Sequence, residues 1–140
     1  MASPLLLLPL LGASGDGPVG GELTLRLADG TAMTVSPASC VESASERGSG
    51  VELRDEHGAA LRFQHDSLTG PALRVFTPEG EPAAELVPRD CQLFHGELRQ
   101  RTEADGPLVE VTYGHLDLEC ERADGMTVSG SLDFDHCLAR

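Results

Sequence analysis

Apolar and polar residues alternate along most of the chain. Leu23, Leu25 and Leu27 are separated by polar residues, and Leu116 and Leu118 repeat the same spacing. A period of two predicts β-strands that bury one face. No stretch shows the 3.6-residue period of an amphipathic helix. Asp-Gly, Glu-Gly and His-Gly pairs, which favour turns, lie between the alternating runs.

The alternating runs predict about nine strands. We place them at residues 22–28, 32–36, 50–54, 59–64, 72–76, 83–87, 91–101, 108–120 and 126–136. Strands of this length and spacing predict an all-β fold, either an antiparallel β-sandwich or a small β-barrel. The polar segment 39–49 is predicted to be a loop that could hold one helical turn.

The parity of each run predicts the core. The residues expected to be buried are Leu25, Val35, Leu53, Phe63, Val75, Leu118, Val128, Leu132 and Phe134. The predicted strand 108–120 does not keep one parity. Its apolar residues Val111 and Tyr113 have odd numbers, whereas Leu116 and Leu118 have even numbers. Gly114 lies between the two sets and can adopt the dihedral angles of a bulge. We therefore predict a β-bulge at Gly114.

An internal similarity links the two ends of the chain. Residues 21–36 and 114–129 match at seven of sixteen positions at a constant offset of 93, including MTVS at 33–36 and at 126–129. Two amphipathic hairpins could converge on this pattern. The alternative is a pseudo-duplicated sheet in which both hairpins occupy related places; a solenoid is excluded, because its repeats are far shorter.

Composition limits the classes of partner. The chain has 140 residues, which suits one domain, and a formal net charge of −13. A strongly acidic surface argues against binding to nucleic acid or to an anionic membrane, since both require basic patches. Lys, Ile and Asn are absent and every cation is Arg, which indicates a high-GC bacterial genome rather than a particular chemistry.

The N-terminus is typical of an export signal. The run LLLLPLL at 5–11 precedes Gly12 and Ala13, and its length suits a signal peptide rather than a membrane span. Ser14 stands where a lipoprotein signal has its lipidated Cys, so no lipidation is expected there. The alternative is a buried N-terminal apolar strand. We predict an export leader and flexible tether over 1–20 and a single disulfide-bonded β domain over 21–140, with membrane contact only through the leader.

Four cysteines, Cys40, Cys91, Cys120 and Cys137, predict two disulfides in an oxidising compartment. No CxxC pair is present, so a zinc ribbon is disfavoured. If strands 91–101, 108–120 and 126–136 form a meander and residue 101 pairs with 108, Cys91 lies near Cys120. A straight last strand keeps Cys137 away from both. This geometry favours Cys91–Cys120 and Cys40–Cys137, unless a kink at Gly130 brings Cys137 to Cys120.

An acidic face is predicted on the last hairpin. Asp117 and Glu119 share one strand with Glu121, and Asp133 and Asp135 lie on the next. Cross-strand carboxylates could converge on Ca²⁺, and the flanking His115 and His136 could extend the site to a transition metal. The weakly predicted metal ligands are Asp117, Glu119, Asp133 and Asp135. The alternative is a solvated acidic face without a cofactor.

Catalysis has little support in the sequence. No GxSxG elbow, P-loop or dinucleotide-binding glycine motif is present. Paired carboxylates for a small secreted hydrolase are available. Aromatic platforms for sugars are scarce, because the chain has four Phe, one Tyr and no Trp. We predict no catalytic residues.

The segment 114–137 carries a family resemblance. LDLEC, then ADG, then MTVSGSLDFDHC resembles the C-terminal hairpin of small exported β-rich lipoproteins and secreted proteins of high-GC bacteria, notably myxobacteria. The resemblance implies an exported disulfide-bonded β domain in the periplasm, on the outer-membrane surface or outside the cell. We expect a non-catalytic cell-envelope domain that acts through protein–protein contacts or self-association. The alternatives are a Ca²⁺- or carbohydrate-binding module and a hydrolase.

Overall fold

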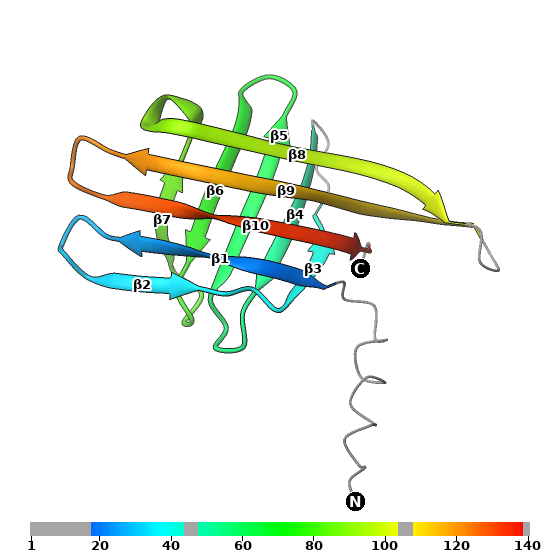
Figure 1. Cartoon of the computed structure of the whole chain (residues 1–140), viewed down its shortest axis with the longest axis horizontal. Helices are drawn as coiled ribbons and strands as arrows, with labels where there is room; N and C mark the ends of the chain where they lie inside the picture. Colours follow the sequence, from blue (N-terminus) through cyan, green and yellow to red (C-terminus); the bar gives the residue numbers. More distant parts are fainter. Residues whose placement is uncertain (1–17, 44–47, 104–107, 139–140) are drawn as a thin grey trace, which may run out of the picture.

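The protein is a sandwich of two five-stranded antiparallel sheets rather than a closed barrel (Figure 1). The computed structural model describes residues 18–43, 48–103 and 108–138. Sheet A consists of β3 (Ser39–Glu42), β4 (Gly48–Arg54), β5 (Ala60–Asp66), β6 (Gly70–Phe76) and β7 (Pro82–Leu86). Sheet B has the order β2 (Ala32–Val35), β1 (Val19–Arg26), β10 (Thr127–Cys137), β9 (Val109–Glu121) and β8 (Cys91–Glu103). A 3₁₀ turn, η3 (Pro88–Asp90), precedes β8.

The two sheets differ in how the chain builds them. Sheet A is a continuous meander, in which each strand from β3 to β7 pairs with the next one along the chain. Sheet B combines the β1–β2 hairpin with the β8–β9–β10 meander, and β1 closes it by pairing with β10. The strands of sheet B run across those of sheet A (Figure 1), as in sandwiches of the crossed type.

The core lies between the two inner faces. All nine residues predicted from strand parity are buried, and Phe63 is the largest side chain among the fully buried ones. The ring of Phe63 lies 6.3 Å from that of Phe94, between centroids. It also lies against Gly96 of β8, where an added Cβ would overlap the ring. Gly96 is therefore the small residue that lets sheet B approach sheet A.

Both disulfides follow the predicted connectivity. Cys91 and Cys120 are joined within sheet B, between β8 and β9. Cys40 and Cys137 are joined between β3 and β10, so this bond links the two sheets. The predicted β8–β9–β10 meander is confirmed, and Gly130 does not fold the last strand back on itself.

The loop prediction for residues 39–49 was wrong at both ends. Ser39–Glu42 is the edge strand β3, and β4 starts at Gly48. Pairing with β4 and the disulfide at Cys40 hold this short strand in place, and neither constraint is visible as a local pattern. The structure accordingly has ten described strands where the pattern indicated about nine.

The predicted bulge at Gly114 was also misplaced. β9 keeps a regular register with β8 through Gly114, whereas its register with β10 shifts directly after the Gly114–Phe134 pair. The irregularity lies across from it in β10, between Phe134 and Cys137, where His136 has a positive φ of 55°. Gly114 is small for another reason, since an added Cβ would overlap the carbonyl oxygen of Glu97 on β8.

The two similar hairpins lie side by side in sheet B. Residues 21–36 fall in β1 and β2, and residues 114–129 span β9 and β10. In the order β2-β1-β10-β9, each hairpin repeats the other in the same orientation. Matching positions are buried in both, as with Leu23 and Leu116. This arrangement is the one expected of a pseudo-duplicated sheet.

The start of the described chain is already a strand. β1 begins at Val19, so residues 19 and 20 of the predicted tether pair with β10. The predicted leader, including Ser14, lies outside the described residues. No helix in the described ranges has the length and hydropathy needed to span a bilayer.

Candidate functional site

The outer face of sheet B carries a group of polar side chains from β8 and β9. In β8, His95, Glu97 and Arg99 are spaced two apart, so their side chains share one face. The register sets Glu97 opposite His115 and His95 opposite Asp117. The inner face of the same strands packs on sheet A, and the rigid sandwich therefore fixes where these outer side chains stand.

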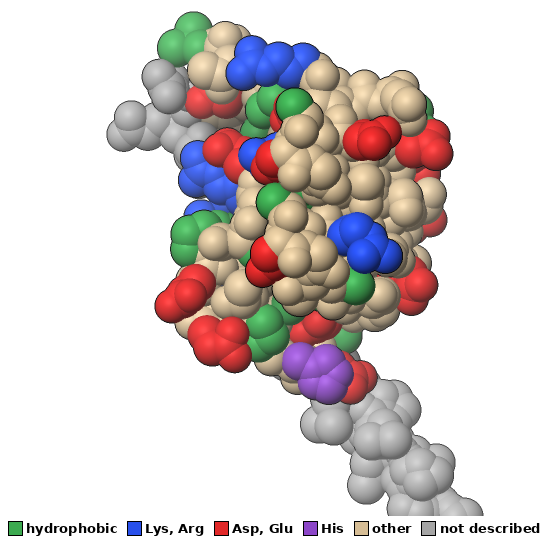
Figure 2. All heavy atoms as spheres, turned by 90° about the vertical axis from the view of Figure 1, so that its left-hand side faces the viewer, with side chains coloured by type: hydrophobic (Ala, Val, Ile, Leu, Met, Phe, Trp, Pro, Cys, Tyr) green, Lys and Arg blue, Asp and Glu red, His purple; other side chains and the backbone are tan. Residues whose placement is uncertain are grey.

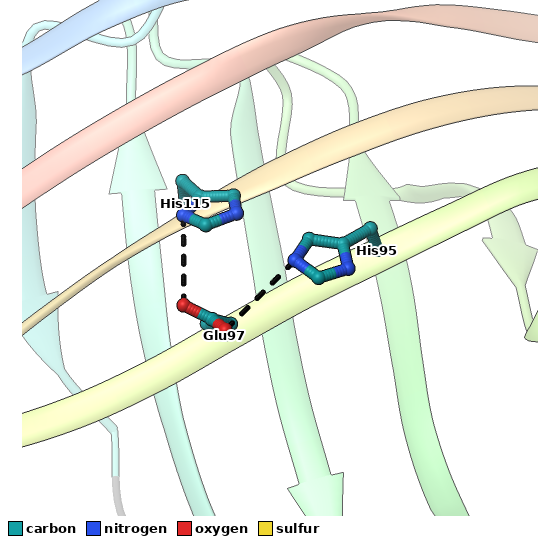
Figure 3. A group of neighbouring side chains, drawn as sticks. All are labelled: His95, Glu97 and His115. Atoms are coloured by element: carbon teal, nitrogen blue, oxygen red, sulfur yellow. Dashed lines mark ion pairs between the residues drawn. The ribbon is translucent and has the colours of Figure 1, made fainter.

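His95, Glu97 and His115 form the His–Glu–His cluster (Figure 3). One ligand atom from each residue lies within 4.8 Å of the others. His95 Nε2 is 3.9 Å from Glu97 Oε2, and His115 Nδ1 is 3.8 Å from Glu97 Oε1. The two imidazole rings are stacked with 4.9 Å between centroids. Figure 3 shows the Glu97 carboxylate beside the two rings, joined to each of them by an ion pair.

Arg99 sets the electrostatics of the cluster. A hydrogen bond from the Arg99 side chain lowers the pKa of Glu97, and the charges of Arg99, His115 and His95 act in the same direction. The Arg99 Nε atom is 3.5 Å from Glu97 Oε1. Glu97 is therefore an ionised carboxylate at neutral pH. Its side chain is 36% exposed, so the cluster is open to solvent.

The four predicted metal ligands do not come together as one site. Asp117 lies opposite Ser131, whose hydroxyl donates to Asp117 Oδ1 at 2.6 Å. Glu119 lies opposite Ser129, and Asp133 lies opposite His115. Asp135 sits in the irregular part of β10 and pairs with Arg101 at 3.0 Å. Across the three described ranges, the His–Glu–His cluster is the group whose candidate ligand atoms converge.

A second charged cluster lies at the far end of the same face. Arg101 bridges Glu103 and Asp135, with 3.0 Å between ions in both pairs. These contacts raise the pKa of Arg101, chiefly through its hydrogen bond to Glu103. His136 Nε2 is 3.1 Å from Glu103 Oε1. The Arg101 guanidinium also lies 4.8 Å above the Tyr113 ring, so this ring is a poor platform for a sugar.

The outer edge of β8 is a further candidate site. β8 is the last strand of sheet B and spans 13 residues, whereas the other edge strands span four or five. Within the described chain no strand pairs with its free side. Three of the four exposed large apolar residues in these ranges belong to the β8–β9 hairpin: Leu93, Leu108 and Val109.

Acidic side chains elsewhere are dispersed rather than gathered. Figure 2 shows red side chains scattered over the end of the sandwich, with Arg between them and small, separate apolar patches. This distribution suits a solvated surface. Some of the acidic residues also have a structural role in the turns between strands, where Asp29 and Asp124 accept hydrogen bonds from backbone N–H groups.

Comparisons with protein families, with characterised proteins and with solved structures find no match to this chain.

Sequence reasoning identified part of this face. It selected His115 and Asp117, but not His95 or Glu97. The assumed pairing of residues 101 and 108 differs from the observed pairing of Arg101 with Val111. The assumed register was therefore wrong by three residues, and it placed Glu97 opposite residue 112 instead of opposite His115. The His-x-Glu spacing at residues 95–97 was a usable sequence signal, because it places both side chains on one face of a strand.

Proposed function

We propose that this protein is an exported, non-catalytic binding domain that acts through protein–protein contacts, and that its partner is a second copy of the chain joined along β8. The observation that carries the proposal is the long free edge of β8. An unpaired edge presents a row of backbone N–H and C=O groups that can pair with another strand.

The other edges of the sandwich are poorer templates. β2 and β3 have four residues each, and β7 has five and begins with Pro82. Proteins commonly limit edge pairing through short strands, prolines or bulges. β8 has an irregularity near Cys91, after which its register with β9 is unbroken from Leu93 to Glu103. This regular stretch contains no proline.

Charges along β8 select an antiparallel copy. With a twofold axis at Arg99, Glu97 of each chain faces Arg101 of the other, and His95 faces Glu103. Opposite charges directly across a strand pair contribute roughly 0.2–1 kcal/mol each. The two copies of Arg99 face one another, but each also lies diagonally near a Glu97. Centring the axis on Gln100 would instead set Glu97 against Glu103 and Arg99 against Arg101, which is repulsive.

Association along β8 would also cover apolar surface. Leu93 is 45% exposed and Leu108 is 73% exposed, at opposite ends of the β8–β9 hairpin. Leu93 belongs to β8 itself, so a second chain paired along this strand would cover apolar surface there. Figure 1 shows the far end of β8 extending past the strands of sheet A.

The compartment is part of the proposal. Two disulfides in a domain of this size are typical of an oxidising environment. The apolar N-terminal run at 5–11 suits an export signal. Together they support action in the periplasm, at the cell surface or outside the cell.

Charge reversal tests the pairing. The variant E97R has arginine at both 97 and 101, and R101E has glutamate at both. Each variant alone should be monomeric, because two attractive pairs become repulsive. A 1:1 mixture should form heterodimers, since every 97–101 pair is then complementary. Sedimentation velocity should show this pattern, with a dissociation constant at least about tenfold weaker for each variant alone, or roughly 1.4 kcal/mol.

The matched control is E110R, which changes a charge on β9 rather than on the free edge. It should associate as the wild type does. The proposal is overturned if the wild-type chain is monomeric at millimolar concentration, or if the mixture of E97R and R101E associates no better than its components.

A further inference from the structure

We propose that His95, Glu97 and His115 bind one divalent transition-metal ion, of the class of Zn²⁺, on the outer face of sheet B. All three ligands come from one chain, so a single copy can form the site. His95 and Glu97 also face the second copy in the proposed association, so metal binding is tested in a monomeric variant as well as in the wild type. The donor set of two imidazoles and one carboxylate suits Zn²⁺, which takes nitrogen and oxygen ligands and can keep a water in a fourth position.

Two separations within the cluster are close to those of ligands around one ion, and one ligand atom from each residue lies within 4.8 Å of the others. The Glu97 oxygens lie 3.8 and 3.9 Å from the facing nitrogens of His115 and His95. These gaps are too long for hydrogen bonds. They are shorter than about 4.2 Å, which is twice a typical Zn–N distance, and slightly longer than the edge of a Zn²⁺ tetrahedron at about 3.4 Å. An ion can therefore bind with small rotations of exposed side chains.

A carboxylate that would support His115 lies just beyond hydrogen-bond distance of its ring. Its Nδ1 atom faces Glu97, and its Nε2 atom lies 4.0 Å from Asp117 Oδ2. Metal-bound histidines commonly donate their second N–H to a carboxylate, which fixes the tautomer and orientation of the ring. Asp117 is itself held by the hydroxyl of Ser131 at 2.6 Å. Asp117 is thus a positioning residue rather than a ligand.

Arg99 opposes the ion. Its guanidinium shares the Glu97 carboxylate, with 3.5 Å between Nε and Oε1, and its positive charge repels a cation. Removal of this charge should strengthen binding, whereas removal of a ligand should weaken it. These opposite changes in affinity distinguish a defined site from loose attraction of cations to an acidic protein. If attraction to the net charge were the only cause, loss of a histidine would not weaken binding.

The ligand chemistry distinguishes this site from a calcium site. Ca²⁺ takes six to eight oxygen ligands, whereas two of the three converging donors here are nitrogens. Imidazole ligands suit Zn²⁺, Cu²⁺ and Ni²⁺. Ca²⁺ is therefore expected to bind far more weakly than Zn²⁺ and serves as the negative probe.

Calorimetric titration of the purified chain with Zn²⁺ tests the proposal. We expect one saturable site in the wild type and in R101E, the variant that is monomeric under the association proposal. H95A and H115A should bind at least tenfold more weakly. D117N should bind about tenfold more weakly, and R99Q should bind more tightly. H57A removes an exposed histidine from the β4–β5 turn and is the matched control.

A second readout does not depend on heat. Titration with Co²⁺ should produce visible absorption bands whose intensity reports low coordination number, and these bands should be lost in H115A. Thermal melts without metal should show that the variants stay folded. The proposal is overturned if wild-type chain shows no saturable Zn²⁺ binding up to millimolar concentration, or if H95A and H115A bind as tightly as H57A.

Discussion

The disulfide between the two sheets should stabilise the fold more than the one within sheet B. Cys40 and Cys137 are almost fully buried, and their bond joins the edge strand β3 to the end of β10. Cys91 and Cys120 link two strands that are already paired. The perturbation is a matched pair of double variants, Cys40→Ala with Cys137→Ala, and Cys91→Ala with Cys120→Ala.

The magnitude follows from the size of the loop that each bond closes in the unfolded chain. The Cys40–Cys137 bond spans 97 residues, and the Cys91–Cys120 bond spans 29. The chain-entropy model gives about 4.7 and about 3.6 kcal/mol respectively at 25 °C. The difference of about 1 kcal/mol should increase further, because removal of the buried sulfurs at 40 and 137 also leaves unfilled space in the core.

Urea unfolding at pH 7, followed by circular dichroism, provides the measurement. The free energy of unfolding in water comes from linear extrapolation. Loss of either cross-link should also raise the m-value, because the unfolded chain then expands further. The larger increase in m-value is expected for the Cys40–Cys137 variant, because the longer closed loop restricts the unfolded chain more.

Two results would refute the reasoning. Equal destabilisation by the two double variants would show that loop size does not set the contribution of each bond. A larger loss from the Cys91–Cys120 variant would show that the β8–β9 pairing depends on its cross-link, and that sheet B is held together more weakly than its register suggests.

Three further substitutions test the packing and the charge network. Gly96→Ala should destabilise by roughly 1–3 kcal/mol because its Cβ overlaps the Phe63 ring, and a double-mutant cycle with Phe63→Leu should recover part of that loss. Phe134→Ala should cost roughly 3–5 kcal/mol, since Phe134 is buried; a loss below about 1 kcal/mol would contradict the burial of the last strand. Burial raises the pKa of Glu52, but hydrogen bonds from Arg54 and Arg62 outweigh it and hold the pKa below its ordinary value of 4.5. The stabilisation from Glu52 is therefore complete above that value and is lost as the pH falls through the lower folded pKa, and Glu52→Gln should flatten this acid limb of the stability curve measured by urea unfolding.

The alternation of apolar and polar residues predicted the core correctly, because a strand that buries one face has an apolar residue at every second position. The nine residues chosen on that basis are all buried. The disulfide connectivity followed from strand length, since a straight β10 keeps Cys137 away from Cys120. The conclusion held despite the register error, because Cys91 lies at the same end of the hairpin under either pairing.

The failures share a physical cause. β3 has adjacent apolar residues, Cys40 and Val41, instead of alternating ones, and both are buried. At the start of β4, Gly48 was assigned to the loop, but it is small because an added Cβ would overlap the carbonyl oxygen of His65 on β5. Contacts between segments distant in sequence determine the residue types at these positions. Such contacts leave no alternating pattern in the local sequence.

The candidate metal cluster escaped prediction for a related reason. A cross-strand site depends on register, and register depends on the length of the hairpin loop. The predicted strands ended at 101 and began at 108, whereas pairing extends to Glu103 and Val109. A shift of three residues is small on the scale of the fold but moves His115 away from Glu97.

The route of the chain through the two sheets imposes an order on folding. Sheet A is encoded by consecutive strands, so each pairing closes a short loop as soon as the next strand is synthesised. β1 is made before all of them, yet its partner β10 is the last described strand, and the entropic cost of closure grows with the length of the intervening chain. β1 can pair with β2 early, but its other edge stays unpaired until β10 is made, and a chaperone would find its target at that edge while sheet A is already formed. Pulse-labelling hydrogen exchange during refolding should protect amides of β4–β6 before those of β1.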